Sequence, residues 1–194
     1  RGKGFLPENN DFKTANKKKI LATFFDAPQT HISFGIPAPE SFSKESLHLN
    51  MLGNILAGGR NARLTKRLRY EKGLIYSVGF GRYGGLQFGS WNIITDTTDN
   101  KVQEVISEMM KELEDVQKNG IKEPELEFVK SRRIKSLKRS MQTSNDWVDF
   151  HAVAEVFSKK IYDINTFVEE TEKTTTSDIK KITDRYLGKD KWQL

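Results

Sequence analysis

The chain has 194 residues, of which 36% are hydrophobic and 30% are charged. This composition favours a single soluble α+β domain over a disordered chain. It contains no cysteine, which excludes disulfides and thiolate metal sites, and no run approaches the roughly 20 apolar residues of a membrane span. The net charge of +6 and the pI near 9.4 invite a nucleic-acid interpretation, but no recognised nucleic-acid module is visible, so basic helix faces are the favoured explanation.

The two ends of the sequence indicate a fragment of a longer chain. Residues 1–17 are polar and are interpreted as a linker or an arriving segment, which leaves 18–194 as a single α+β domain. The first residue is Arg1 rather than Met, and the last four residues resemble the start of a strand. No leader is visible in this fragment, so the compartment stays open, with a periplasmic or other soluble compartment favoured.

Two short segments near the start of the domain have strand character. Residues 20–25 form an apolar run that ends before Asp26 and Pro28. Residues 31–36 alternate, with Ile32, Phe34 and Ile36 on one face. The short proline-containing turn between the two segments suggests that they pair as antiparallel strands.

A helix, a glycine break, a second helix and a hairpin follow. Ser41 or Ser43 is a credible N-cap for a helix that ends near Ala57, before the Gly-Gly pair at 58–59. A strongly basic helix then runs to Gly73. Residues 74–95 are predicted to form a hairpin, with strands at 74–80 and 86–93 joined by a turn at 82–85.

The second half of the chain changes to helical periodicity. Apolar residues recur at helical spacing over several segments, each bounded by capping residues, proline or glycine. Strands first and then mostly helices predict an α+β layer fold, with an antiparallel or mixed sheet packed by helices. The expected helices cover residues 102–119, 124–142, 145–157, 163–168 and 176–188.

Several common catalytic patterns are absent from the sequence. The three histidines, His31, His48 and His151, are not at ligand spacing for a zinc peptidase helix, so no metal site is expected within this chain. His48 is interpreted as a packed core residue. The G-x-G-x-x-G match at 79–84 is followed by a strand rather than a helix, which indicates a hairpin turn and not a dinucleotide site.

The central stretch LGNILAGGRNARLTKRLRYEKGLIYSV resembles the insulinase (pitrilysin) family of zinc metallopeptidases. Homologous halves of that family carry a helix, a Gly-Gly break, an Arg-Leu helix, Leu-Arg and then Gly-Leu-x-Tyr-Ser. The resemblance covers most of the chain and implies a metallopeptidase-half fold like that of the mitochondrial processing peptidase and LuxS. The helix at 43–57 holds Glu45 and His48 but no zinc motif, so the resemblance implies the zinc-free, C-terminal-type half, with zinc expected in a partner half.

The resemblance also implies a pair of site residues. Zinc-free halves contribute an arginine and a tyrosine seven residues apart to the substrate chamber, and Arg69 and Tyr76 match this spacing. A tyrosine hydroxyl donates to one oxygen, and a guanidinium can fork onto neighbouring carbonyls. The structural alternative is a surface ion pair of Arg69 with Glu71 or another acid, with Tyr76 packed in a strand. No catalytic residue is expected within this chain alone.

The favoured function is therefore the substrate-binding half of an insulinase-like zinc metalloendopeptidase, which cleaves peptides when it closes against a zinc-bearing half in the same polypeptide or in a separate subunit. The alternative is a non-catalytic scaffold of the same fold, as in core subunits of respiratory complexes. A basic nucleic-acid-binding domain, using the helix at Lys130–Arg139, is the least favoured interpretation. No membrane partner is expected.

Overall fold

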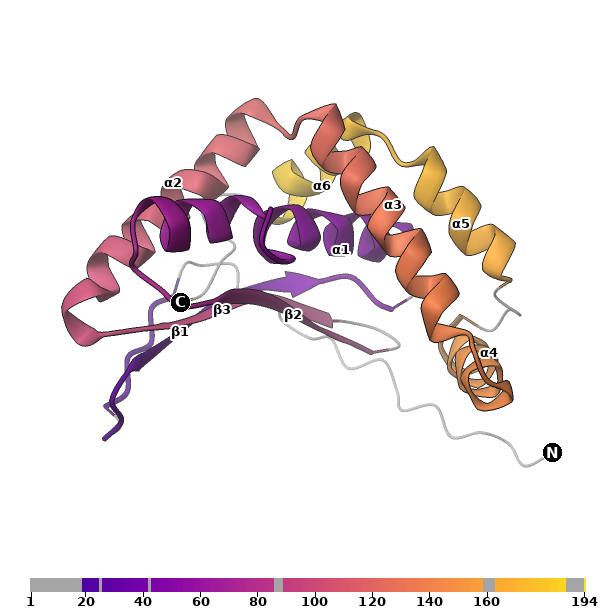
Figure 1. Cartoon of the computed structure of the whole chain (residues 1–194), viewed down its shortest axis with the longest axis horizontal. Coiled ribbons are helices and arrows are strands. Elements are labelled where there is room, and N and C mark those ends of the chain that lie inside the picture. The colour runs from indigo at the N-terminus through magenta and orange to yellow at the C-terminus, as the bar shows by residue number, and fades with distance from the viewer. Residues whose placement is uncertain (1–18, 25, 42, 86–88, 159–162, 188–193) are drawn as a thin grey trace.

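The protein is a sheet covered by helices on one face (Figure 1). The computed structural model describes residues 19–24, 26–41, 43–85, 89–158, 163–187 and 194, so the predicted linker at 1–17 lies outside the described residues. The predicted α+β class is confirmed. The elements in chain order are β1 (Thr30–Ala38), α1 (Lys44–Ala57), the π-helix η1 (Thr65–Glu71), β2 (Val78–Gly84), β3 (Gly89–Thr97), the short 3₁₀-helix η2 (Asp99–Lys101), α2 (Val102–Asn119), α3 (Glu123–Ser140), α4 (Ser144–Ser158), α5 (Ile164–Lys173) and α6 (Thr176–Tyr186).

The described strands pair antiparallel in the order β1-β3-β2. Alternation along the strands sends Phe34 of β1 and both Trp91 and Ile93 of β3 to the helix-covered face, where each is at most 1% exposed. The opposite face carries small and polar residues such as His31, whose Nδ1 lies 2.8 Å from Asp96 across the strands. One face of the sheet therefore belongs to the core, and the other is open.

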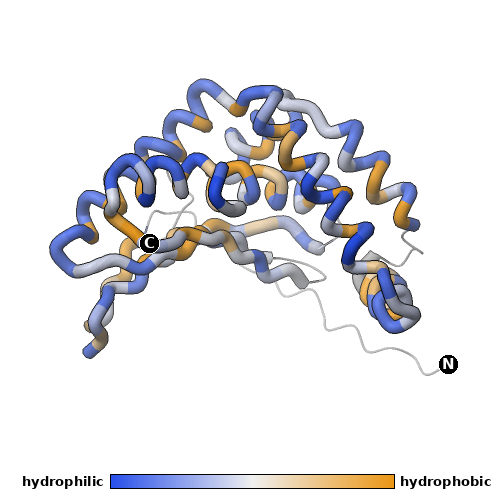
Figure 2. Tube along the Cα trace, viewed as in Figure 1, coloured by the Kyte–Doolittle hydropathy of each residue, from blue (hydrophilic) through white to orange (hydrophobic). Residues whose placement is uncertain are grey.

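Helix α1 crosses the inner face of the sheet and is the centre of the core. Leu49, Met51, Leu52 and Leu56 are fully buried, and apolar positions gather between α1 and the strands in Figure 2. Ser43 is the N-cap, and its hydroxyl accepts a bond from the Ser46 amide. One of the two predicted capping residues is thus confirmed.

His48 lies inside this core, as predicted for a packed residue. Its side chain is 5% exposed, and burial lowers its pKa. A low pKa keeps the imidazole neutral at physiological pH, because a charged ring would lose solvation in the core.

The predicted position of the hairpin was wrong by about four residues. The first strand begins at Val78 instead of residue 74, and it continues through the predicted turn to Gly84. Residues 74–77 form a connector outside the ladder, because two of its carbonyls are bound by side chains: Leu74 accepts from the Thr97 hydroxyl and Ser77 from the Thr95 hydroxyl, both at 2.7 Å. Side-chain bonds of this kind compete with regular strand pairing.

The predicted first strand and its pairing with β1 were also wrong. Residues 20–24 are exposed and have no strand structure. The backbone at residues 19–21 instead forms hydrogen bonds with Leu194. The Leu21 amide donates to the Leu194 carbonyl, and the Leu194 amide donates to the Lys19 carbonyl. A hollow of about 470 Å³ lies between this segment and β1.

Helices α2 to α6 complete the covering layer, and α3, α4 and α5 extend beyond the β2 side of the sheet (Figure 1). Their ends lie within a few residues of the predicted ones, apart from α5, which continues to Lys173 rather than 168. Thr175 caps α6 with a reciprocal bond to Asp178, one residue before the predicted cap. Among the described residues, no helix is both long and apolar enough to span a bilayer.

Candidate functional site

The candidate site is built on η1, the π-helix that follows the Gly-Gly break. Leu64 and Leu68 are fully buried and anchor one side of this helix in the core. A π-helix is rare and often marks a functional site, because its wider turn moves side chains away from α-helical positions. Gly73 ends it with a φ of 61°, a left-handed conformation that glycine adopts without a Cβ penalty.

Three cations surround one buried carboxylate of α2, and two of them, Arg67 of η1 and the next residue after η1, Lys72, hold η1 against α2. Glu108 of α2 accepts hydrogen bonds from Lys111 at 2.8 Å and from Arg67 at 2.7 Å, and Lys72 lies 3.4 Å away. These partners lower the pKa of Glu108 to about 2. The carboxylate is therefore ionised throughout the physiological range, and η1 is tied to α2 through its own basic residues.

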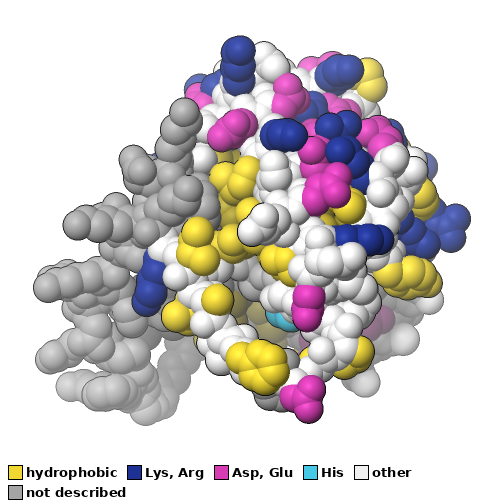
Figure 3. Space-filling model, turned by 90° about the vertical axis from the view of Figure 1, so that its left-hand side faces the viewer, with side chains coloured by type: hydrophobic (Ala, Val, Ile, Leu, Met, Phe, Trp, Pro, Cys, Tyr) yellow, Lys and Arg dark blue, Asp and Glu magenta, His cyan; other side chains and the backbone are white. Residues whose placement is uncertain are grey.

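Arg63 makes a second tie just before η1. Its guanidinium donates two bonds of 2.7 Å to Glu125 of α3 and one of 3.1 Å to Asp115 of α2. The hydrogen bond to Glu125 raises the pKa of Arg63. Figure 3 shows the left-hand side of Figure 1 face on, and acidic and basic side chains lie intermixed there. Ion pairs between neighbouring helices require such a mixture.

The connector at 74–77 holds Tyr76 in place from both sides. The carbonyls of Leu74 and Ser77 accept the two threonine bonds from β3 described above. The Leu74 amide donates to the Leu68 carbonyl at 2.8 Å, which closes the connector against η1. The backbone around Tyr76 is thus fixed, while its side chain is 78% exposed.

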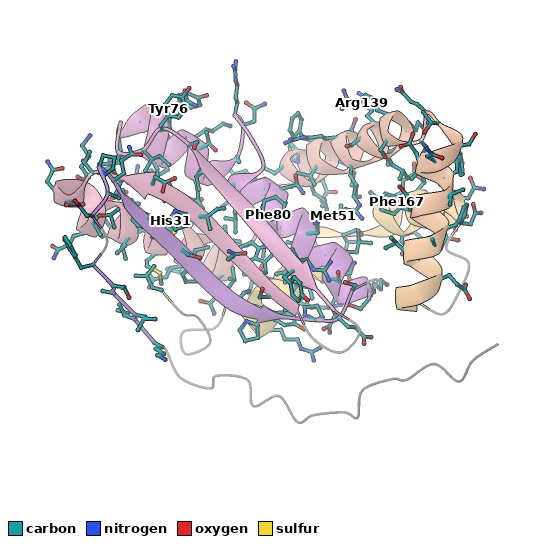
Figure 4. All side chains as sticks on the ribbon, turned by 90° about the horizontal axis from the view of Figure 1, so that it is seen from below. His31, Met51, Tyr76, Phe80, Arg139 and Phe167 are labelled. Atoms are coloured by element: carbon teal, nitrogen blue, oxygen red, sulfur yellow. The ribbon has the colours of Figure 1, made fainter. Side chains whose placement is uncertain are left out.

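Arg69 and Tyr76 lie in contact at the surface. The guanidinium carbon of Arg69 is 4.7 Å from the centroid of the Tyr76 ring and 5.5 Å from that of Tyr70. Cation–π contacts of this length orient the guanidinium without occupying all of its donors. Figure 4 shows Tyr76 at the edge of the molecule, at the η1 end of the sheet.

The observed contacts of Arg69 and Tyr76 differ from the structural alternative, in which Arg69 forms a surface ion pair with Glu71 or another acid and Tyr76 packs in a strand. Glu71 accepts its bond from Arg67 at 3.1 Å, and among the described residues Arg69 has no ion pair. Tyr76 lies before β2 and is exposed, so it is not a packed strand residue. Both polar ends are available to a ligand.

The cross-links around η1 were not predicted from the sequence. Glu108 shares its helix with several other acidic residues, and nothing in its local pattern distinguishes the one that is buried. Tyr70 could have been found as the neighbour of Arg69 in the Leu-Arg-Tyr segment. In the part of the chain that the structure describes, no group of three His, Cys, Asp or Glu residues could hold a metal ion.

Curated relatives of the chain are zinc proteases by name. An uncharacterized zinc protease of Mycobacterium leprae is 24% identical over 168 residues, which cover 84% of this chain and 37% of the relative. The uncharacterized zinc protease YmxG of Bacillus subtilis is 26% identical over 164 residues, covering 84% of this chain and 38% of the relative. The chain therefore spans less than half the length of these relatives.

Solved structures share the fold at low sequence identity. A protease from Helicobacter pylori matches with a TM-score of 0.83 at 15% identity, over 93% of this chain and 44% of the other. The inactive peptidase domain of a putative zinc protease from Bordetella parapertussis matches with a TM-score of 0.72 at 15% identity, over 87% of this chain and 92% of the other. A chain of complex III from Candida albicans, with Inz-5 bound, matches with a TM-score of 0.75 at 14% identity, over 91% and 43%.

A family model described as the peptidase M16 inactive domain matches residues 6–133. The match includes α1, η1, the hairpin and most of α3, and it agrees with the zinc-protease names of the relatives. The resemblance to insulinase-family zinc metallopeptidases is confirmed. The chain belongs to the family of peptidase M16 inactive domains.

Proposed function

We propose that this domain is the substrate-binding half of a zinc metalloendopeptidase and that it acts on peptides when it closes against a zinc-bearing half. The observation that carries the proposal is the contact between Arg69, a half-buried residue of the braced π-helix, and the exposed Tyr76 of the connector that follows it. The pair is held by buried leucines, by the Glu108 and Arg63 cross-links and by the threonine-bound connector. Such bracing is expected of groups that must meet a ligand in fixed geometry.

The chemistry of the two side chains suits a peptide undergoing hydrolysis. A tyrosine hydroxyl can donate one hydrogen bond to the oxygen on which negative charge develops. A guanidinium can hold neighbouring backbone carbonyls through its planar set of donors. The partner half would supply the metal, which polarises the scissile carbonyl and activates water. In this proposal, Arg69 and Tyr76 bind and orient the peptide.

The proposal is tested by Tyr76→Phe in the complete protein, which includes the zinc-bearing half. Loss of one donor to a developing oxyanion lowers turnover by about 100-fold or more, and we expect a fall of this size in peptide kcat. Zinc content should stay unchanged, because no ligand of the metal is altered. Arg69→Ala should raise KM as well, since it removes contacts to the bound peptide.

The matched control is Tyr83→Phe, which removes a hydroxyl from an exposed tyrosine of β2, the strand that follows the connector. Its kinetics should equal those of the unmodified protein. Equal turnover for Tyr76→Phe and Tyr83→Phe would remove the proposed role of the pair.

A scaffold without catalysis is the second candidate, because the same fold occurs in a chain of complex III. The two candidates differ in what the zinc-bearing half contains. A complete zinc motif in the neighbouring half, together with peptide cleavage by the complete protein, favours the peptidase. A neighbouring half without that motif favours the scaffold.

A further inference from the structure

A second tyrosine ring lies beside the guanidinium of Arg69. The guanidinium carbon is 4.7 Å from the centroid of the Tyr76 ring and 5.5 Å from the centroid of the Tyr70 ring. Both distances are within the roughly 6 Å over which a cation is attracted to an aromatic face. The proposed function assigns Arg69 and Tyr76 to the peptide but gives Tyr70 no task.

The two rings reach Arg69 from different elements. Tyr70 follows Arg69 directly on η1, whereas Tyr76 belongs to the connector and lies at the edge of the molecule in Figure 4. A π-helix has more residues per turn than an α-helix, because its hydrogen bonds join residues five apart rather than four. Consecutive side chains therefore point in more similar directions, which favours contact between Arg69 and Tyr70.

These rings are the contacts that orient Arg69 in the described part of the chain. The residue is half-buried, and no described carboxylate pairs with it, since Glu71 of the same helix accepts its bond from Arg67. An arginine side chain has many rotamers and loses this freedom when it binds a ligand. Contact with two rings restricts the guanidinium before the ligand arrives.

The ring of Tyr70 reaches Arg69 without contributing to the core. The side chain is 54% exposed, and it is not among the residues that form the hydrophobic core or pack against it. Its hydroxyl has no hydrogen-bond partner among the described residues. Core packing therefore does not account for an aromatic side chain at this position, whereas contact with Arg69 does.

We propose that Tyr70 is a positioning residue for Arg69: its ring, together with that of Tyr76, holds the guanidinium in the orientation that meets the peptide. The inference rests on the proposed function, because it requires Arg69 to contact the peptide. A group that is oriented in advance loses less entropy when the ligand binds. The ring of Tyr70 therefore contributes to peptide affinity and not to the chemical step.

The kinetic test compares two substitutions in the complete protein. Tyr70→Leu removes the ring but keeps an apolar side chain, and Tyr70→Phe keeps the ring. An exposed cation–π contact changes an equilibrium by about two- to fivefold, so Tyr70→Leu should raise KM by this factor with kcat unchanged. Tyr70→Phe should keep the unmodified KM. A role in stability would instead shift urea unfolding, which should be the same for both variants and the unmodified protein.

A second readout needs no peptide. Nitrogen-15 relaxation of the 194-residue chain measures the order parameter of the Arg69 Nε–H bond. We expect it to fall in Tyr70→Leu toward the values below about 0.6 that mark flexible groups, and to stay unchanged in Tyr70→Phe. Tyr83→Leu is the matched control, because it removes another exposed ring, on β2. It should leave the order parameter and KM unchanged.

The two readouts separate failure of this inference from failure of the proposed function. The positioning role is overturned if Arg69 is as ordered in Tyr70→Leu as in Tyr83→Leu. It is also overturned if Tyr70→Leu keeps KM in a protein in which Arg69→Ala raises it. Unchanged kinetics for both Arg69→Ala and Tyr76→Phe would instead remove the proposed function, and with it the peptide-binding part of this inference.

Discussion

At the scale of single residues, the sequence predicted the proposed contact pair but not what positions it. Arg69 and Tyr76 could be named because their identity and spacing match a family pattern along the chain. The ties to Glu108 and Glu125 join residues 41 and 62 positions apart. Pairs of this kind depend on how helices dock, which local periodicity does not determine.

The Glu108 cluster makes a pH-dependent contribution to stability. Hydrogen bonds from Lys111 and Arg67 lower the pKa of Glu108 from its ordinary value of 4.5 to about 2. The folded chain therefore takes up this proton at lower pH than the unfolded chain does. The stabilisation is fully present above about pH 4.5 and is lost as the pH falls through about 2.

Urea unfolding of Glu108→Gln at several pH values tests this contribution. At pH 7 the variant should unfold at a lower urea concentration than the unmodified chain, and the difference should shrink between pH 4.5 and pH 2. Glu104→Gln is the control, because Glu104 is half-exposed and Lys72 is its one ion-pair partner among the residues that the structure describes. A difference that stays constant with pH would contradict the cluster's assigned effect.

At the scale of elements, helices were predicted more accurately than strands. The helical segments have long apolar periodicity and clear caps, as in α2 and α6. The connector at 74–77 alternates like a strand in sequence, yet two of its carbonyls, those of Leu74 and Ser77, are bound by threonine hydroxyls from β3. The alternation was real, but a tertiary contact decided the backbone pairing.

Thr97→Val tests the role of this connector. The Thr97 side chain is buried and donates to the Leu74 carbonyl at 2.7 Å. Valine has nearly the same shape but leaves that carbonyl without its partner, so we expect a loss of about 1–3 kcal/mol in the free energy of unfolding. Peptide turnover by the complete protein should also fall, because Tyr76 would be less firmly held.

The control for this substitution is Thr98→Val at the next, exposed position, where the hydroxyl donates to the Asn100 side chain and to no other group in the described part of the chain. Stability and turnover should change little in the control. A Thr97 variant that keeps both quantities would show that the connector is held by other contacts.

At the scale of the whole molecule, the order of elements predicted the fold class but not the pocket between β2 and α3. Strands followed by helices imply a sheet covered on one face. This pocket depends on α3 to α5 extending past β2, which brings Arg82 into the same lining as Arg133, 51 positions later in the sequence. The basic residues of α3 looked like one solvated face, but two of its arginines turn toward α1.

Metal removal tests the division of labour between this domain and its proposed partner. A chelator should abolish peptide cleavage by the complete protein, because the zinc-bearing half supplies the metal in the proposed function. The same chelator should leave the thermal unfolding of the isolated 194-residue chain unchanged, since its described residues form no metal-binding group and a ligand stabilises only the state that binds it. Calorimetry of the chain with and without chelator, beside an activity assay of the complete protein, measures both effects. A lower unfolding temperature of the isolated chain after chelation would place a structural metal in this half and contradict the assignment of zinc to the partner.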